Sequence, residues 1–193
     1  MINWWWIRHG PTHHKGLVGW SDIAADLSNV TALKRLQTHL PEDGLVISSD
    51  LQRCVTTADT IQGARIRLPH NDKLREFNFG DWELRNASDI AKEYPELSKK
   101  YWSSPGKASP PHGESWNQAA KRVCSAVDEI SAEHQGKNII AVGHFGVILT
   151  QLQRAAKMPA SSAISFQIDN LSITRIEYLG GNDWRVLGVN CKP

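Results

Sequence analysis

The most constraining feature of the sequence is a short apolar run near its start that ends abruptly in two cationic side chains. Residues 2–7 are rich in tryptophan and isoleucine, and Arg8 and His9 follow directly, before Gly10 and Pro11. A run this short, aromatic and branched predicts a β-strand that is covered on both faces. Gly10 and Pro11 predict that the strand ends there, because they break regular ladder geometry. Arg8 and His9 are therefore expected at the carboxyl end of a buried strand.

That position favours a ligand site. In open α/β sheets, the loops and helix amino termini that follow the strands gather at the carboxyl edge, where ligands bind. A second apolar run, residues 138–142, ends in a similar way at Gly143 and His144. His144 would meet His9 if the two strands are neighbours in the sheet. Taken alone, Arg8 and His9 could equally belong to salt bridges on the surface.

Apolar periodicity along the rest of the chain predicts alternating strands and helices, and hence an α/β fold. We expect a three-layer α/β/α sandwich with a mostly parallel sheet and right-handed crossovers. The expected strands cover residues 2–7, 45–49, 66–68, 138–142, 163–169, 171–178 and 184–189. The expected helices cover residues 30–40, 50–61, 88–94, 115–134 and 147–157. Ser28 or Asn29 can cap the first of these helices.

The chain of 193 residues is expected to form one domain, residues 1–193, that buries about 70% of its unfolded surface. Residues 85–113 change in character, because turns rich in proline, glycine and serine interrupt the alternation. We expect this segment to form a small cap insertion over the site. Loops of this kind commonly select the substrate, while the sheet holds the reacting groups.

Composition argues against several classes of protein. Lys and Arg total 22 and Asp and Glu total 20, so the net charge is +2, without a basic block. We therefore expect neither nucleic acid nor a membrane surface as a partner. Cys54, Cys124 and Cys191 are odd in number and widely spaced, which predicts reduced thiols. No leader or long apolar run is visible, so the expected location is the cytoplasm.

Residues 8–12, Arg-His-Gly-Pro-Thr, resemble the Arg-His-Gly-x-Thr signature of the histidine phosphatase superfamily, which includes the cofactor-dependent phosphoglycerate mutases. Further segments resemble stretches of that family in the same order, namely residues 48–58, 74–83, 111–115 and 138–147. The resemblance implies a phosphoglycerate mutase-like fold. Within the family, the length and motifs look similar to α-ribazole phosphatases and broad-specificity phosphatases.

The resemblance also implies roles for individual side chains. Arg53 matches the second phosphate-binding arginine of the family, and Glu76 matches its proton donor. With Arg8, His9 and His144, these residues would form a cation-rich cup that contains one carboxyl group. Arginine suits such a cup, because its forked donors match phosphate oxygens and its charge persists at any working pH.

The residue types in this cup favour a two-step hydrolysis of a phosphomonoester. A neutral imidazole is a competent nucleophile near neutral pH, so His9 is the expected nucleophile and phosphohistidine the expected intermediate. Glu76 would protonate the leaving alkoxide and then act as a base on water. Arg8, Arg53 and His144 would stabilise the transferring group. No metal or other cofactor is expected, because two arginines would repel a divalent cation.

Further substrate contacts are assigned to Gly10, Thr12, Lys15 and Phe145. Lys15 stands where the family often has asparagine, and it could contact phosphate or simply be solvated. Thr12 is the favoured accessory contact.

The chain departs from the family pattern at several positions besides Lys15. Leu84 replaces the glycine that usually follows Trp-Glu, Gly143 replaces a hydroxyl residue, and Phe145 replaces a glycine. Glu114 and Ser115 match a family segment but could act only as a helix cap. These differences affect the walls of the expected site and leave its five chemical residues in place.

Two alternatives to hydrolysis stay open. The first is phosphoryl transfer of the phosphoglycerate mutase type, which is disfavoured by the short chain and by the residues after Glu76 and His144. The second is a non-catalytic protein that binds a phosphorylated ligand, which the departures from the family pattern suggest. In each case the expected partner is a small phosphorylated metabolite. The sequence does not indicate the oligomeric state.

Overall fold

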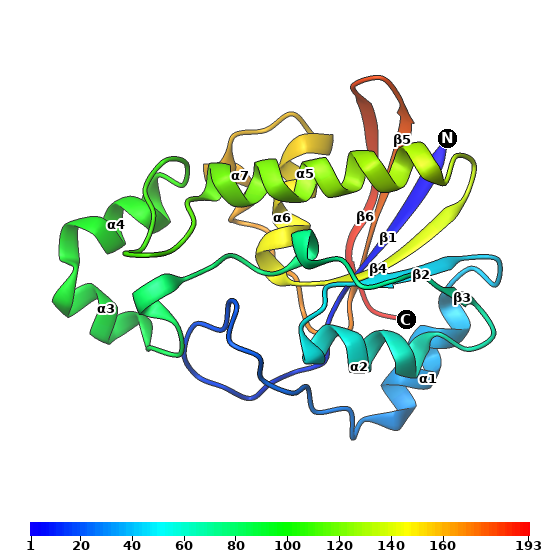
Figure 1. Ribbon diagram of the computed structural model, residues 1–193, viewed down its shortest axis with the longest axis horizontal. Helices are drawn as coiled ribbons and strands as arrows, with labels where there is room; N and C mark the ends of the chain where they lie inside the picture. The colour runs from blue at the N-terminus through cyan, green and yellow to red at the C-terminus, as the bar shows by residue number, and fades with distance from the viewer.

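A single six-stranded sheet forms the centre of the computed structural model, which describes residues 1–193 (Figure 1). The strand order is β3-β2-β4-β1-β5-β6. The strands are β1 (Ile2–Arg8), β2 (Leu45–Ser48), β3 (Ile66–Arg67), β4 (Asn138–Gly143), β5 (Ile173–Gly180) and β6 (Asp183–Cys191). The first four are mutually parallel, whereas β5 is antiparallel to both of its neighbours, β1 and β6, so the expectation of a mostly parallel sheet is confirmed.

Helices cover both faces of the sheet. One face packs against α1 (Val30–His39) and α2 (Gln52–Ile61) through Trp5, Ile7 and their neighbours. The other packs against α5 (Trp116–Glu133), α6 (Phe145–Ala155) and α7 (Ala160–Ala163) through Trp4 and Trp6. Successive tryptophans take opposite faces because side chains alternate along a strand. The expected three-layer sandwich is confirmed.

The register of the two central strands places the expected histidines together. Strand β1 pairs with β4 in parallel, and Arg8 lies opposite Gly143. The next residues along the two strands are His9 and His144. The backbone N–H of His9 donates to the Gly143 carbonyl at 3.1 Å, which continues the pairing one residue beyond β1.

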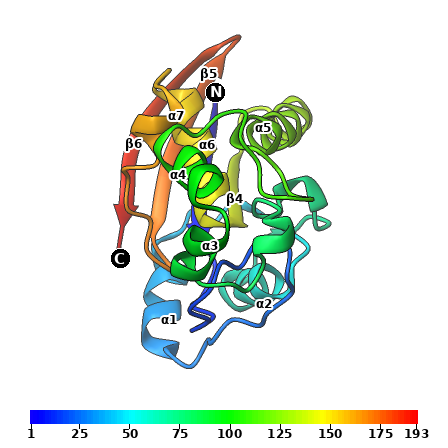
Figure 2. The same ribbon diagram turned by 90° about the vertical axis from the view of Figure 1, so that its left-hand side faces the viewer.

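The segment expected to cap the site contains two short helices, α3 (Ala87–Glu93) and α4 (Pro95–Ser103). They extend beyond the sheet in Figure 1 and lie toward the viewer in Figure 2. Helix α4 was not predicted, because Pro95 indicated only an interruption. Proline at the first helical position costs nothing, since its missing N–H would have no partner there, and here it starts a new helix. Two 3₁₀ turns, Asp72–Leu74 and Gly80–Trp82, precede the segment.

Two other expectations about secondary structure need correction. The strand expected over residues 163–169 does not form, since Ala163 ends α7 and the chain continues in turns. The N–H groups of Ser165 and Phe166 donate to carbonyls three residues earlier, which satisfies the backbone locally. Helix α6 begins at Phe145 rather than Val147, because His144 is already extended and takes the cap position.

The helix cap expected at Ser28 or Asn29 is made by Asn29, whose side chain accepts from the N–H of Ala32 at 3.1 Å. No helix in the structure is both long and apolar enough to cross a bilayer.

Leu84 occupies a backbone conformation that favours glycine. Its φ angle is +62°, and its N–H donates to the Leu17 carbonyl at 2.7 Å, which ties two loops together. The turn therefore keeps its geometry without the usual glycine, at the cost of strain between Cβ and the backbone.

Leu84→Gly should stabilise the protein by about 1 kcal/mol, because the relief of left-handed strain exceeds the added freedom of the unfolded chain. The side chain is 45% exposed, so little burial is lost. Urea unfolding measures the change. Leu84→Ala is the matched control, since it removes the side chain but keeps the strain, and it should show no such gain. An equal gain in both variants would contradict the explanation by strain.

Candidate active site

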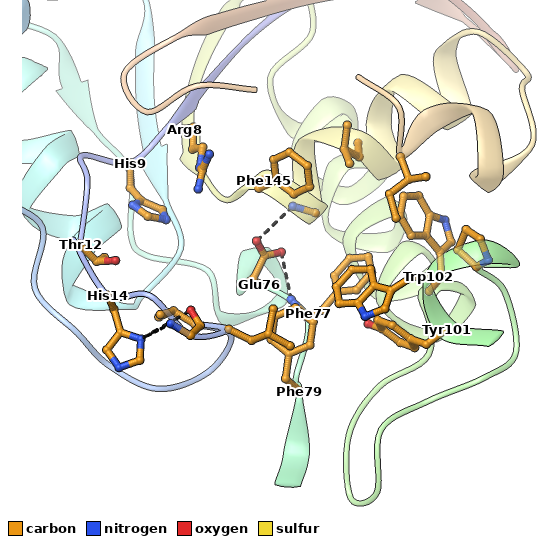
Figure 3. A pocket seen from close by; sticks show the side chains of 18 residues that line it. Arg8, His9, Thr12, His14, Glu76, Phe77, Phe79, Tyr101, Trp102 and Phe145 are labelled. Carbon is orange, nitrogen blue, oxygen red and sulfur yellow. Dashed lines mark hydrogen bonds between the residues drawn. The ribbon is translucent and has the colours of Figure 1, made fainter. Parts of the chain in front are cut away.

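The candidate site lies where β1 and β4 end. The imidazole rings of His9 and His144 meet edge to face, with 5.2 Å between their centroids and 64° between their planes. Figure 3 shows Arg8, His9 and Glu76 around one cavity, with Phe145 beside them. The parallel register brings the two histidines together, as the sequence predicted.

Local contacts orient the ring of His9. Its Nδ1 lies 2.7 Å from the Gly10 carbonyl oxygen, which can only accept, so Nδ1 carries the proton and Nε2 keeps its lone pair. Asn170 donates from Nδ2 to the His9 carbonyl at 2.7 Å and steadies the main chain. Burial, with the Arg53 charge second, lowers the pKa of His9 to about 3. His9 is thus a neutral imidazole at ordinary pH.

His144 is fully buried and lies against a thiol. Its Nε2 is 3.3 Å from Sγ of Cys54, which also lies 3.5 Å from the Gly143 carbonyl oxygen. Burial lowers the pKa of His144 well below its usual range and raises the pKa of the Cys54 thiol. Both groups are therefore neutral. The three cysteines are free, as the sequence predicted.

Arg8 and Arg53 bring positive charge to the site, and neither forms an ion pair. Arg8 donates from Nη1 to the Ile168 carbonyl at 2.7 Å, and its guanidinium lies 5.4 Å from the Phe145 ring centroid. Arg53 is fully buried in the first turn of α2 and does not line the cavity, although its charge helps to lower the pKa of His9. The Nε of each arginine is buried without a hydrogen-bond partner. Buried cations without a counter-ion are costly, and an anionic ligand would compensate them.

Backbone carbonyls of one loop hold Arg53 in place. Its Nη1 donates to Ser21 at 2.9 Å and its Nη2 to Gly19 at 2.6 Å. The loop is held in turn by the carboxylate of Glu83. This carboxylate accepts from the N–H groups of Gly19, Trp20, Ser21 and Phe79 and from the Ser21 hydroxyl.

Glu83 is therefore not a solvated loop carboxylate. It organises the loop that positions Arg53. The only signal in the sequence was its place in the Trp-Glu motif, since nothing in the spacing connects residue 83 to residues 19–21.

Glu76 is the only carboxyl group that lines the cavity, and it is buried. Its two oxygens accept from the N–H groups of Phe77 and Gly146, each at 3.1 Å. Burial raises its pKa, against the opposite effect of those two hydrogen bonds and of Arg53 and Arg8. The protonated form therefore persists to higher pH than in an ordinary glutamate, as a proton donor requires.

The ion pair between Arg122 and Glu114 lies against the backbone of Glu76. Arg122 donates to both carboxylate oxygens of Glu114, at 2.8 and 2.7 Å, and to the Glu76 carbonyl at 3.2 Å. The indole of Trp20 donates to the same carbonyl at 2.8 Å. Ser115 caps α5 with a capping box, whereas Glu114 pairs with Arg122 and is not part of that cap. The sequence did not indicate Arg122.

The accessory residues separate into two groups. Thr12 and Phe145 line the cavity, and His14 lines it as well. Gly10 and Lys15 do not. Gly10 is buried, donates its N–H to the Thr57 hydroxyl at 3.0 Å, and leaves no space for a side chain beside Leu27. Lys15 is exposed.

The arrangement combines a neutral imidazole, a buried carboxyl group whose pKa is raised, and two arginines that lack anionic partners. These groups can bind a phosphoryl group, attack it and protonate its leaving group. No three His, Cys, Asp or Glu side chains gather as a metal would require. Independence of metals stays a prediction.

Comparison with known proteins identifies the family. The family model of the histidine phosphatase superfamily (branch 1) matches residues 4–192, so the chain belongs to this family and is an enzyme. The adenosylcobalamin/alpha-ribazole phosphatase of Escherichia coli strain K12 is 30% identical over 172 residues, 86% of this chain and 84% of that protein. An Escherichia coli O1:K1 protein named probable phosphoglycerate mutase GpmB is 26% identical, and the alignment covers 92% of this chain and 86% of that protein.

Solved structures agree on the fold. YhfR of Bacillus stearothermophilus superposes with a TM-score of 0.87 at 25% identity, over 97% of this chain and 96% of that one. The alpha-ribazole phosphatase of Shigella flexneri gives a TM-score of 0.82 at 26% identity, over 98% of this chain and 96% of that one. The family resemblance and the fold class expected from the sequence are thus confirmed.

Gly143 at the end of β4 and Gly146 in the first turn of α6 should differ in their tolerance of a side chain. A Cβ at Gly146 would lie 2.6 Å from Oε1 of Glu76 and 3.0 Å from the Phe77 ring, whereas a Cβ at Gly143 would meet nothing closer than 3.6 Å. Gly146→Ala should destabilise the protein by about 1–3 kcal/mol through overpacking, and Gly143→Ala should not. Urea unfolding of the two variants measures this. Equal stability would contradict the close approach of Gly146 to Glu76.

Proposed function

We propose that the protein is a metal-independent phosphatase that hydrolyses a small phosphomonoester through a phosphohistidine on His9. One observation carries the proposal. Arg8 and Arg53 lie at the site as cations without carboxylate partners, beside a neutral imidazole and a buried carboxyl group whose pKa is raised. A phosphoryl group supplies the missing negative charge, and the remaining two groups are the nucleophile and the acid that its transfer requires.

In the first step, Nε2 of His9 attacks phosphorus and the bond from phosphorus to the alkoxide oxygen breaks. The tautomer supports this role, because the Gly10 carbonyl holds the proton on Nδ1 and leaves Nε2 free. Glu76 gives its proton to the leaving oxygen, so an alcohol departs and Glu76 becomes a carboxylate. The N–H groups of Phe77 and Gly146 then stabilise that carboxylate.

Arginine side chains stabilise the negative charge on the oxygens of the transferring phosphoryl group. Arg8 lines the cavity and has a buried Nε–H without a partner, which it can donate to an equatorial phosphate oxygen. Arg53 and His144 lie behind the cavity, where the Arg53 charge acts on His9 and the His144 ring packs against it. Because backbone carbonyls fix both arginines before the substrate arrives, little reorganisation is needed.

In the second step, water attacks the phosphohistidine. Glu76, now a carboxylate, removes a proton from the water, and the bond between phosphorus and Nε2 of His9 breaks. Inorganic phosphate leaves, His9 is neutral again, and Glu76 is again protonated. One residue serves as acid and then as base, which keeps the proton balance closed without a metal.

The relatives' names support a small phosphorylated substrate. Alpha-ribazole phosphatase appears among both the sequence relatives and the solved structures. The name probable phosphoglycerate mutase also occurs, and mutase activity uses the same first step. Hydrolysis differs in that water, rather than a second alcohol, takes the phosphoryl group.

The departures from the family pattern do not favour a protein that only binds. Gly143 leaves space, and Leu84 keeps the turn that glycine usually makes. Phe145 packs against Arg8, and Lys15 is exposed. None of these residues displaces a group that the reaction needs, so turnover is the better-supported proposal.

Brief exposure to a ³²P-labelled phosphomonoester should trap an acid-labile, base-stable label on His9. His9→Ala should lose both the label and phosphate release, because the Gly10 carbonyl leaves a lone pair on Nε2 of His9. His14 also lines the cavity, but it accepts the Gly16 N–H at Nδ1 and so carries its proton on Nε2. His39→Ala, which alters an exposed histidine on α1, is the control and should keep both. Phosphate release by folded His9→Ala at the wild-type rate would contradict the mechanism. Transfer of the label to a phosphoglycerate instead of water would favour the mutase.

The pH profile of kcat/KM should show an alkaline limb due to Glu76 and no imidazole limb between about pH 5 and 7. Burial raises the pKa of Glu76, so activity is present below that pKa and is lost as pH rises through it. The pKa of His9 is about 3, so its lone pair survives down to that pH.

The measurement compares an alkyl phosphate, whose leaving alkoxide needs the Glu76 proton, with 4-nitrophenyl phosphate, whose leaving group needs no acid. Each profile is corrected for the second ionisation of the substrate, at about pH 6. The alkaline limb should appear with the alkyl phosphate and be absent with 4-nitrophenyl phosphate, and in Glu76→Gln the kcat for the alkyl phosphate should fall by about 10²–10⁴-fold. An equal alkaline limb with both substrates would assign it to another group.

A further inference from the structure

We propose that the leaving group of the substrate is an uncharged aromatic or largely apolar alcohol, held in an aromatic subsite beyond Glu76. The inference rests on the proposed function and names the class of substrate. The aromatic subsite is defined as the part of the cavity lined by Phe77, Phe79, Tyr101, Trp102, Trp116 and Phe145.

The cavity is small and mostly apolar. It has a volume of about 270 Å³, and ten of its eighteen lining residues are hydrophobic. Figure 3 shows Arg8 and His9 at one end, Glu76 and Phe145 between, and Tyr101 and Trp102 at the other end. A phosphoryl group bound by the arginines would therefore direct its leaving group past Glu76 toward the two aromatic residues of α4.

Charge is confined to the reacting end. Arg8 and Glu76 are the only Lys, Arg, Asp or Glu residues that line the cavity. The nearby arginines are already engaged, Arg75 with Asp50 and Arg122 with Glu114. A second anionic group on the leaving alcohol, such as a carboxylate, would lose its hydration and find no cation in the aromatic subsite. The structure thus disfavours phosphoglycerates as substrates.

The aromatic side chains offer both edges and faces to a ligand. Tyr101 and Trp102 are perpendicular, with centroids 4.9 Å apart, and Phe77 and Trp116 are nearly so, at 5.4 Å. Trp102 is 37% exposed, which leaves part of its ring free for contact. Aromatic rings prefer offset-stacked or edge-to-face partners, and this arrangement accommodates another ring. Burial of a phenyl group here should improve affinity by at least about tenfold over a methyl group.

Calorimetric binding of three phosphonates tests the subsite without relying on turnover. Benzylphosphonate, methylphosphonate and phosphonoacetate share the headgroup and differ only in an aromatic, a minimal or a charged tail. Benzylphosphonate should bind at least about tenfold more tightly than methylphosphonate, and phosphonoacetate should bind no more tightly than methylphosphonate. Equal affinity of the benzyl and methyl compounds, or a preference for phosphonoacetate, would overturn the proposal.

Two variants assign the preference to this surface. Trp102→Ala should reduce the ratio of benzyl to methyl affinity by about threefold or more. Leu179→Ala is the matched control, because Leu179 is equally exposed, at 37%, and does not line the cavity. It should leave the ratio unchanged. An unchanged ratio in folded Trp102→Ala, confirmed by circular dichroism, would contradict the assignment.

Hydrolysis of benzyl phosphate and ethyl phosphate separates this proposal from the proposed function. Both release alcohols that are poor leaving groups, so a lower KM for benzyl phosphate reflects contact with the tail. If the phosphonates bind as expected but neither ester is hydrolysed, the subsite stands and the phosphatase mechanism fails. If both esters are hydrolysed with equal KM, the mechanism stands and the aromatic subsite is overturned.

Discussion

The structure depends on keeping two arginine cations at a buried site without giving them carboxylate partners. Arg8 and Arg53 are held by the backbone carbonyls of Ile168, Gly19 and Ser21, which orient the guanidinium groups but do not neutralise them. The carbonyls need support of their own, and the Glu83 carboxylate supplies it through hydrogen bonds to the loop. The negative charge of Glu83 thus supports the loop that holds Arg53 and does not contact the guanidinium group. The site itself keeps its positive charge for an anionic ligand.

The same burial acts in opposite directions on the two groups proposed to react. Burial disfavours charge, so it lowers the pKa of His9 and raises the pKa of Glu76. Each shift favours the neutral form of its group, which is the form that phosphoryl transfer requires of a nucleophile and of an acid. The arrangement costs stability, since unpaired buried polar groups are retained where a carboxylate or an apolar side chain would be more favourable. A cost of this kind is typical of a site kept for function.

Local pattern predicted most of the fold and most of the candidate site. The apolar runs before His9 and His144 identified two strands, and parallel pairing was enough to bring both residues together. Errors arose where one pattern fits two structures. The alternation over residues 163–169 suggests a strand, but the local backbone bonds of turns satisfy the same N–H groups. Pro95 signals the end of one helix and the start of another equally well.

The sequence by itself determined which residues are the candidates for the chemistry and at which edge of the sheet they lie, because strand periodicity and chain direction are local properties. It did not indicate that Glu83 supports Arg53, or that Arg122 and Trp20 hold the Glu76 carbonyl, because each contact joins loops distant in the chain. Many of these partners are backbone groups, which have the same chemistry at nearly every position. Only the tertiary structure decides which carbonyl or N–H faces which side chain. It also places Tyr101 and Trp102 of the cap segment on the same cavity as Arg8, His9 and Glu76.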